Sequence, residues 1–121
     1  AGACITVLGL TFKEDCPDVR NTKVIDIIDE LKDYGVEVVV HDPVADQAAV
    51  YDEFGIELAE KEQLNNLDCV VLAVGHHEFK DQYDLNMLDS LYRTDHKVLI
   101  DVKSILNRKE CEAQGYHYWS L

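Results

Sequence analysis

Lys13 and Lys103 are the side chains in this sequence best suited to binding an anion. Each follows an apolar run typical of a buried strand, the first at residues 4–10 and the second at 96–102. An ammonium group placed there can donate charge-assisted hydrogen bonds to a phosphate or sugar oxygen, each contributing about 1.5–3 kcal/mol. Two merely solvated lysines are an equally simple interpretation of their position.

The segment after the first apolar run is crowded with charge, although a plain connection needs about four residues. Its charged residues are Lys13, Glu14, Asp15, Asp18, Arg20 and Lys23. Arg20 lies just before an expected helix N-terminus, where the helix dipole disfavours a cation unless an anion answers it. Asp18 can supply that anion in an ion pair that stiffens the loop, and direct contact of Arg20 with a ligand is the alternative.

Other familiar chemistries find little support. His76 and His77 have only Glu78 beside them and, if they lie on a strand, point to opposite faces, so no metal site is expected. The connection after the first run carries neither G-x-G-x-x-G nor G-x-x-x-x-G-K-[ST], so NAD binding by this chain alone is not expected. Asp42, before Pro43, is assigned a turn role.

The apolar periodicity predicts the strands and helices around the two lysines. Apolar residues recur at helical spacing through 24–34, in a helix that Thr22 can cap and Gly35 can end. We predict strands at 4–10, 36–42, 56–58, 68–75, 96–102 and 116–121, and helices within 45–54, 60–65, 84–92 and 105–114.

This alternation predicts a single α/β domain over residues 1–121, a Rossmann-like three-layer sandwich with a mainly parallel sheet of five to six strands. Ligands of such sheets bind beyond the carboxyl ends of the strands, near the point where strand order reverses. Lys13 and Lys103 are both expected at that edge.

Composition narrows the partners. The 121 residues carry a formal net charge of -13, which disfavours nucleic acid and anionic membranes as partners. No apolar run approaches the roughly 20 residues of a membrane span, and no leader precedes the first strand, so a cytoplasmic location is expected. The four cysteines, Cys4, Cys16, Cys69 and Cys111, form no C-x-x-C pair and are expected to be free thiols.

The stretch "VLGLTFKEDCPDVRNTKVIDIIDELKDYGVEVVVHDP", followed by "VVLAVGHHEF" and "LIDVKSIL", resembles the C-terminal, UDP-binding domain of the UDP-glucose/GDP-mannose dehydrogenase family. The family pattern G-x-x-F-K and D-x-R-x-[ST] is matched by Gly9, Phe12, Lys13, Asp18, Arg20 and Thr22. The residues of these stretches are most similar to those of the branch that oxidises UDP-N-acetylhexosamines for capsule, Vi-type or O-antigen polysaccharide. Lys103 stands where members oxidising UDP-glucose usually carry the Arg of a "D-G-R" motif, which argues against UDP-glucose.

The resemblance implies a role for each matched residue. Phe12 and Lys13 would contact the UDP-sugar, and Lys103 would reach a phosphate or the sugar, either here or in the active site of a partner subunit. Arg20 would contribute to substrate binding. Gly9, Asp18 and Thr22 would structure the loop.

The resemblance also implies a three-part enzyme of which this chain, opening at Ala1 without an initiator Met, is a fragment. An N-terminal domain would bind NAD, a central helical segment would form the homodimer, and a catalytic Cys would take the sugar C6 alcohol through an aldehyde and a thiohemiacetal to the uronic acid. No cysteine here matches that Cys segment, so no catalytic residue, bound cofactor or metal is expected in the fragment. A docking module without ligand affinity and a freestanding nucleotide-binding regulator are the alternatives.

Overall fold

The protein is described by a computed structural model over residues 3–11, 13–19 and 22–120. Its strands are β1 (Cys4–Leu8), β2 (Glu37–His41), β3 (Cys69–Leu72), β4 (Lys97–Asp101) and β5 (Tyr116–Ser120). Its helices are α1 (Val24–Asp33), α2 (Gln47–Phe54), α3 (His77–Gln82), α4 (Leu85–Asp89) and α5 (Arg108–Ala113), with a 3-10 turn η1 (Lys61–Gln63).

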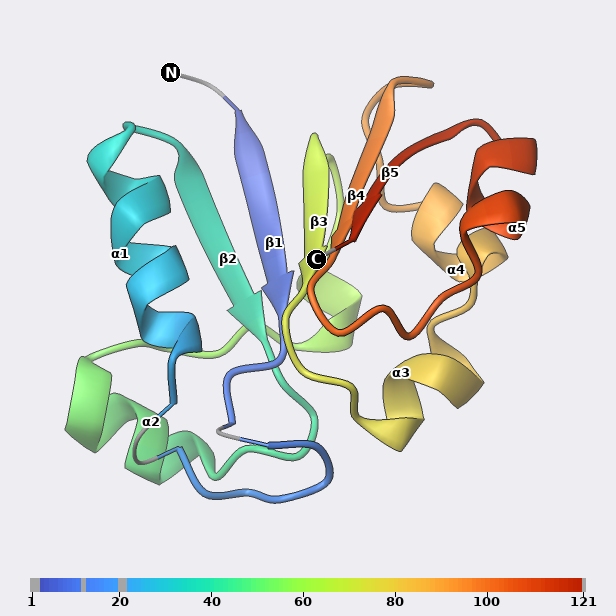
Figure 1. The fold of residues 1–121 in the computed structure, drawn as a ribbon. Coiled ribbons are helices and arrows are strands. Elements are labelled where there is room, and N and C mark those ends of the chain that lie inside the picture. Colours follow the sequence, from blue (N-terminus) through green and yellow to red (C-terminus); the bar gives the residue numbers. More distant parts are fainter. Residues whose placement is uncertain (1–2, 12, 20–21, 121) are drawn as a thin grey trace.

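The five strands form one sheet in the order β2-β1-β3-β4-β5, and every neighbouring pair is parallel. The chain leaves β1 for the β2 side and returns to the other side with β3, so the strand order reverses between β1 and β3. Both strands end at the lower edge of the sheet in Figure 1. This edge is where an open parallel sheet binds its ligands.

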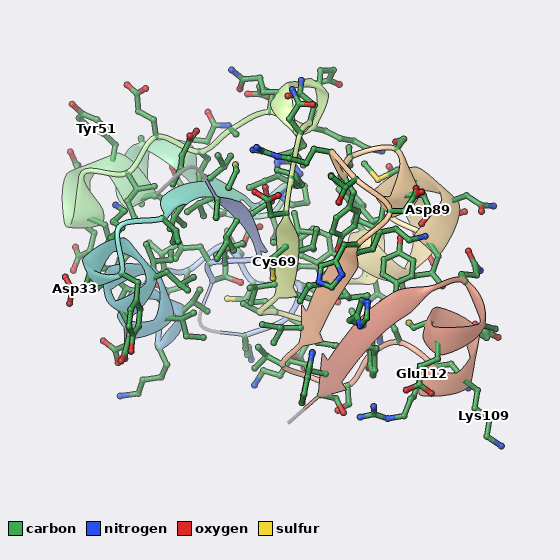
Figure 2. All side chains as sticks on the ribbon, turned by 90° about the horizontal axis from the view of Figure 1, so that it is seen from above. Asp33, Tyr51, Cys69, Asp89, Lys109 and Glu112 are labelled. Atoms are coloured by element: carbon green, nitrogen blue, oxygen red, sulfur yellow. The ribbon has the colours of Figure 1, made fainter. Side chains whose placement is uncertain are left out.

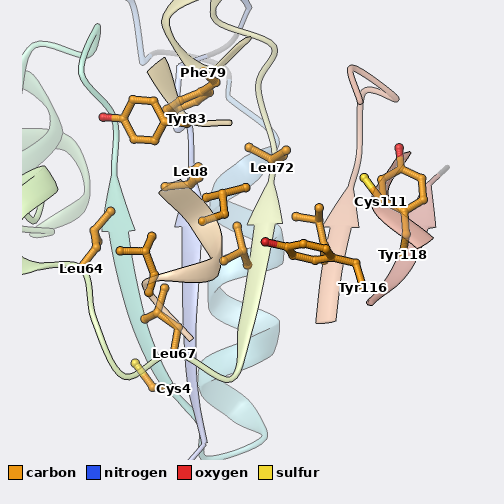
Figure 3. Packing of buried hydrophobic residues seen from close by; sticks show 14 residues of the cluster. Cys4, Leu8, Leu64, Leu67, Leu72, Phe79, Tyr83, Cys111, Tyr116 and Tyr118 are labelled. Carbon is orange, nitrogen blue, oxygen red and sulfur yellow. The ribbon is translucent and has the colours of Figure 1, made fainter. Parts of the chain in front are cut away.

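Helices cover both faces of the sheet, with α1 and α2 on one side and α3, α4 and α5 on the other (Figure 1). Side chains of β1 alternate between the two layers, because successive residues of a strand point to opposite faces. Leu8 packs with Phe79, Tyr83 and Leu88 in one cluster (Figure 3), whereas Val7 packs in the cluster that contains Ile28 of α1. The predicted three-layer α/β fold is confirmed, and its parallel sheet has five strands, within the predicted five to six.

Two elements differ from the prediction. Residues 56–58 form no strand. The chain there runs beside β2, and the N–H of the following Ala59 donates to the Val40 carbonyl at 2.8 Å. The strand expected to continue through residue 75 instead ends at Leu72; the chain bends at Val74, and helix α3 begins at His77. His76 and His77 therefore lie at the start of α3 and not on a strand, so strand geometry does not turn them to opposite faces.

The surface is dominated by acidic and other polar side chains. Figure 2 shows Asp33 at the α1 end of the molecule, and Lys109 and Glu112 at the α5 end. No helix within the described ranges combines the length and apolar character that crossing a bilayer demands.

Candidate functional site

The exit from β1 passes unusually close to the chain that leaves β3. Gly9 has φ 101°, and a Cβ added there would lie 2.7 Å from the Val74 Cβ and 2.9 Å from the Val74 nitrogen. Both the left-handed backbone and the missing side chain are therefore needed at this position. The Gly9 N–H donates to the His41 carbonyl at 2.9 Å, which also ties this exit to the end of β2.

A buried carboxylate organises the loops after β1 and β2. One oxygen of Asp42 accepts the N–H groups of Leu10 at 2.7 Å and Thr11 at 3.3 Å. The other oxygen accepts the N–H groups of Val44 at 2.8 Å and Ala45 at 3.0 Å. Asp42 does make the turn before Pro43, as the sequence indicates, and it also fixes the start of the lysine-bearing loop.

The Asp42 carboxylate is bonded in turn to His76, whose side chain is fully buried. The His76 Nε2 lies 3.0 Å from the Asp42 Oδ2, and its Nδ1 accepts the Asp15 N–H at 2.8 Å. Since a backbone N–H only donates, Nδ1 carries no proton and Nε2–H donates to Asp42. Burial alone would raise the pKa of Asp42, but hydrogen bonds from His76 and from the Leu10 and Val44 N–H groups outweigh it and lower that pKa.

Asp15 closes the loop from its other end. Its backbone has φ 60°, a conformation that Asp tolerates better than most residues. Its carboxylate accepts the His77 N–H at 2.9 Å and contacts the His77 Nδ1. The hydrogen bond from the His77 backbone, followed by that from its side chain, lowers the pKa of Asp15. The Thr11 hydroxyl donates to the Lys13 carbonyl at 2.8 Å, so the backbone on both sides of the Lys13 side chain is held.

A second buried carboxylate holds the loop that carries Lys103. Asp101, at the end of β4, accepts the N–H groups of Ile105 at 3.1 Å and Leu106 at 2.8 Å. The Tyr118 hydroxyl donates to the same carboxylate at 2.6 Å. Burial, followed by this hydrogen bond, raises the pKa of Tyr118. Lys103 thus lies on a turn that is fixed on the sheet edge, as Lys13 does.

The two loops and the start of α1 surround one small pocket of about 140 Å³. The pocket is lined by Thr11, Lys13, Thr22, Lys23, Val24, Ile27, Ala73, Val74, Val102 and Lys103. Among these lining residues are three lysines and no carboxylate. A chain with a formal net charge of -13 therefore keeps one concave, cationic spot at the point where its strand order reverses.

The predicted site residues fall into three groups. Lys13, Lys103 and Thr22 line the pocket together. Gly9 lies beneath it at the β1 exit, while Asp18 lines a different hollow beside Asp46 of the α2 N-terminus. The predictions for Phe12 and Arg20 lie outside the described residues.

Thr22, which is predicted to cap α1, lies one residue before the N-cap position of that helix. Helix α1 begins at Val24, with Lys23 at the boundary making no side-chain cap. The Thr22 hydroxyl nevertheless accepts the Val24 N–H at 3.2 Å and donates to the Thr11 carbonyl at 3.5 Å. It therefore links the helix start to the loop after β1.

The sequence alone suggests no ligand-binding role for Lys23, and for His76 it raises only the question of a metal site. Lys23 belongs to the charged segment already noted, but its place in the pocket depends on where α1 begins. His76 is a structural centre of the site. No group of three or more His, Cys, Asp or Glu residues able to hold a metal occurs in the part of the chain that the structure describes.

Three of the four thiols are unsuited to nucleophilic chemistry. Cys4, Cys16, Cys69 and Cys111 are free, as predicted. Burial raises the pKa of Cys69 and of Cys111 to about 11, and it also raises the pKa of Cys4. These three thiols therefore stay protonated near neutral pH, where a nucleophile needs a thiolate.

Known proteins of similar sequence point to one family. The family model for the UDP-glucose/GDP-mannose dehydrogenase family, UDP binding domain, matches residues 6–108. Protein CapL of Staphylococcus aureus is 44% identical over 99% of this chain and 27% of its own length. A UDP-N-acetyl-D-glucosamine 6-dehydrogenase of Pseudomonas aeruginosa is 40% identical over 92% of this chain and 26% of its own length.

A solved structure agrees with these sequences. The crystal structure of the NDP-N-acetyl-D-galactosaminuronic acid dehydrogenase from Methanosarcina mazei Go1 superimposes with a TM-score of 0.86 at 25% identity, covering 98% of this chain and 24% of that one. The chain thus spans about a quarter of the length of the relatives it matches. It belongs to the UDP-glucose/GDP-mannose dehydrogenase family and comprises that family's UDP-binding domain.

Proposed function

We propose that this chain binds the diphosphate of a UDP-sugar in the pocket between Lys13, Lys23 and Lys103. The observation that carries the proposal is the set of three lysines, without a carboxylate, around a small pocket at the reversal of strand order. A diphosphate brings several negative charges to a compact group, and the three lysines that line the pocket can supply the charge-assisted hydrogen bonds it needs. Local cations at hydrogen-bond distance outweigh the remote acidic surface, which salt screens beyond about 8–10 Å.

The size of the pocket limits what this chain holds by itself. A pocket of about 140 Å³ is smaller than the roughly 300–1,000 Å³ typical of small-molecule sites. It suits the phosphates and leaves the sugar to be enclosed by another part of the enzyme. Phe12 and Arg20 are proposed to add contacts to the substrate at the same edge, while Gly9, Asp18 and Thr22 order the loop.

The residues of this chain do not suit NAD. A dinucleotide fold uses a glycine-rich turn after the first strand and an acid after the second to bind the ribose. Here the turn after Gly9 carries side chains throughout, and the Asp42 oxygens already accept four backbone N–H groups and the His76 ring. We therefore assign NAD to the remainder of a full-length enzyme.

In that full-length enzyme, the proposed reaction is the NAD-dependent oxidation of the C6 alcohol of a UDP-N-acetylhexosamine to the uronic acid. The name of the relative from Pseudomonas aeruginosa, a UDP-N-acetyl-D-glucosamine 6-dehydrogenase, supports this substrate class. The proposal includes a role in making capsule or related surface polysaccharide. The proposed setting is a cytoplasmic homodimer in which an N-terminal NAD-binding domain and a central helical segment of the same chain complete the site.

Isothermal titration calorimetry of this chain with UDP tests the proposal. We expect saturable binding of UDP and none of uridine, which lacks the phosphates. Lys13→Ala and Lys103→Ala should each weaken UDP binding by about 10- to 100-fold, the equivalent of one charge-assisted hydrogen bond. Lys109→Ala, on the exposed surface of α5 (Figure 2), is the matched control and should leave binding unchanged.

The opposite pattern would overturn the proposal. UDP affinity that is unaffected by Lys13→Ala and Lys103→Ala would place the nucleotide elsewhere. An absence of UDP binding by the wild-type chain would favour the alternative of a docking module.

A further inference from the structure

We propose that the buried imidazole of His76 is a positioning residue, which holds the loop after β1 so that Lys13 faces the phosphate pocket. This inference rests on the proposed function of that pocket. His76 itself does not line the pocket, and its side chain is fully buried. Its effect on a ligand must therefore pass through the loop it contacts.

The contacts of His76 define one protonation state. Its Nδ1 accepts the Asp15 N–H at 2.8 Å, so the ring proton belongs on Nε2. That proton points to the Asp42 Oδ2 at 3.0 Å, with the Thr11 Oγ1 at 3.3 Å. Since the Thr11 hydroxyl donates its own proton to the Lys13 carbonyl, it can only accept from His76. Each polar atom in this set then has a partner of the right kind.

The arrangement gives the imidazole two separate tasks. Through Nε2 it bonds to the Asp42 carboxylate, which is held by four backbone N–H groups of the loops after β1 and β2. Through Nδ1 it holds the Asp15 N–H, two residues beyond Lys13. The Phe79 ring, with its centroid 5.3 Å from that of His76, supports the imidazole from α3.

The loop needs this support because it has little packing of its own. Lys13, Glu14 and Asp15 are all exposed, and Asp15 adopts a left-handed backbone. An exposed loop of this kind loses conformational freedom when a ligand orders it, and that cost weakens binding. Holding Asp15 in place before the ligand arrives removes part of the cost.

Two substitutions separate the two tasks of the ring. The side-chain oxygen of His76→Asn can take the place of Nδ1 and accept the Asp15 N–H, but the donor to Asp42 is lost. The amide of His76→Gln reaches the place of Nε2 and donates to Asp42, but it leaves the Asp15 N–H without its acceptor. Leu88→Ala, at the buried residue of α4, is a control that destabilises the core at a position outside the loop after β1.

Amide hydrogen exchange and UDP titration of these variants test the inference. We expect His76→Gln to speed exchange of the Asp15 amide and to weaken UDP binding by about 10-fold, the usual effect of one lost hydrogen bond. His76→Asn should keep the Asp15 amide protected and stay within about 3-fold of the wild-type affinity. Leu88→Ala should lower the melting temperature with no selective change at Asp15.

Two results would overturn the inference. One is a His76→Gln variant with a protected Asp15 amide and wild-type UDP affinity. The other is a loss of affinity that follows the melting temperature equally in all three variants, because a general loss of stability would then explain it. If the wild-type chain does not bind UDP, the proposed function fails, yet exchange at Asp15 still decides whether His76 holds the loop.

A measurement on the wild-type chain covers the case in which the variants do not fold. Long-range ¹H–¹⁵N NMR spectra report which ring nitrogen of a histidine carries the proton. We expect the spectrum to show that the Nε2 of His76 carries the proton and that its Nδ1 is unprotonated and accepts a hydrogen bond. A proton on Nδ1 would rule out the bond to the Asp15 N–H and with it the positioning role.

Discussion

Lys13 and Lys103 line the same pocket although β3 lies between the strands that precede them. Lys13 follows β1 and Lys103 follows β4, and each loop is held by a buried carboxylate, Asp42 for the first and Asp101 for the second. The two cations are therefore brought together by backbone anchoring on the sheet edge rather than by contact with each other.

Lys23 should affect binding and stability in opposite directions. It lines the pocket at the boundary of α1, where a positive charge opposes the helix dipole. Lys23→Ala should weaken UDP binding several-fold and raise the free energy of unfolding by about 0.3–1 kcal/mol. Lys32→Ala, in the last turn of α1, should lower the free energy of unfolding and leave UDP binding unchanged. Calorimetry and urea denaturation of the two variants check this, and a Lys23→Ala variant with unaltered UDP affinity would remove Lys23 from the site.

Among the glycines that the structure describes, Gly9 should tolerate substitution least. Gly9→Ala meets Val74 at 2.7 Å and also keeps a left-handed backbone of φ 101°, so we expect a loss of about 2–4 kcal/mol in the free energy of unfolding. Gly35→Ala has the same kind of backbone, φ 78°, with nothing within 4 Å, and should lose only about 1–2 kcal/mol. Urea denaturation of both variants separates the steric part from the backbone part. Equal losses would show that the chain after β3 moves aside easily.

Asp42 should carry stability that depends on its charge. Asp42→Asn replaces one oxygen by a donor that faces backbone N–H groups, and we expect a loss of about 2–4 kcal/mol at neutral pH. Asp46→Asn makes the same chemical change at the exposed cap of α2, where Asn serves equally well, and should change stability by less than about 0.5 kcal/mol.

The stabilisation that the Asp42 carboxylate provides should decrease in acid. The pKa of Asp42 is lowered in the folded protein, so its contribution is fully present above the ordinary value of 3.8 and is lost as pH falls through the lower, folded value. The difference in stability between the wild type and Asp42→Asn should therefore narrow below about pH 4. Urea denaturation at a series of acidic pH values measures it, and a difference that stays constant would show that Asp42 is not ionised in the fold.

The sequence carried enough information for the sheet and for two of the three lysines, because a buried strand is readable from its apolar run and ligand sites of parallel sheets follow strand ends. The sequence alone could not show that Lys23 lines the pocket, because its place there depends on where α1 begins. Helix α3 has six residues with Phe79 as its buried residue, so it leaves no apolar period to read. The short apolar alternation at 56–58 fits a strand equally well, and only the tertiary arrangement shows that it does not join the sheet. The role of His76 could not be predicted because it depends on contacts with two loops, the one after β1 and the one after β2.

Tyr83 should make the fold sensitive to alkali. Its hydroxyl donates to the His41 Nε2 at 2.6 Å, since the His41 Nδ1 is bonded to the Ala59 carbonyl. Burial, with Glu78 and Glu62 nearby, raises the pKa of Tyr83 from 10.0 to about 12. Stability from this group is therefore full below pH 10 and is lost as pH rises towards about 12, where the unfolded chain releases the proton first.

Tyr83→Phe tests this window. At neutral pH it should cost about 1–2 kcal/mol, because the His41 ring loses its donor. Between pH 10 and 12 its stability should fall less steeply than that of the wild type, by at most about 1.4 kcal/mol per pH unit. Tyr51→Phe, at a residue 58% exposed, is the control and should follow the wild-type curve. Parallel curves for Tyr83→Phe and the wild type would contradict the assignment.

The location of the phosphate site can be mapped from the amide chemical shifts of the ¹⁵N-labelled chain on titration with UDP. We expect the largest shift changes at Lys13, Lys23, Val24 and Lys103, and no change of those shifts with uridine at the same concentration. Shifts gathered instead in the acidic hollow around Asp46 and Asp52, or the same shifts with uridine as with UDP, would contradict this location.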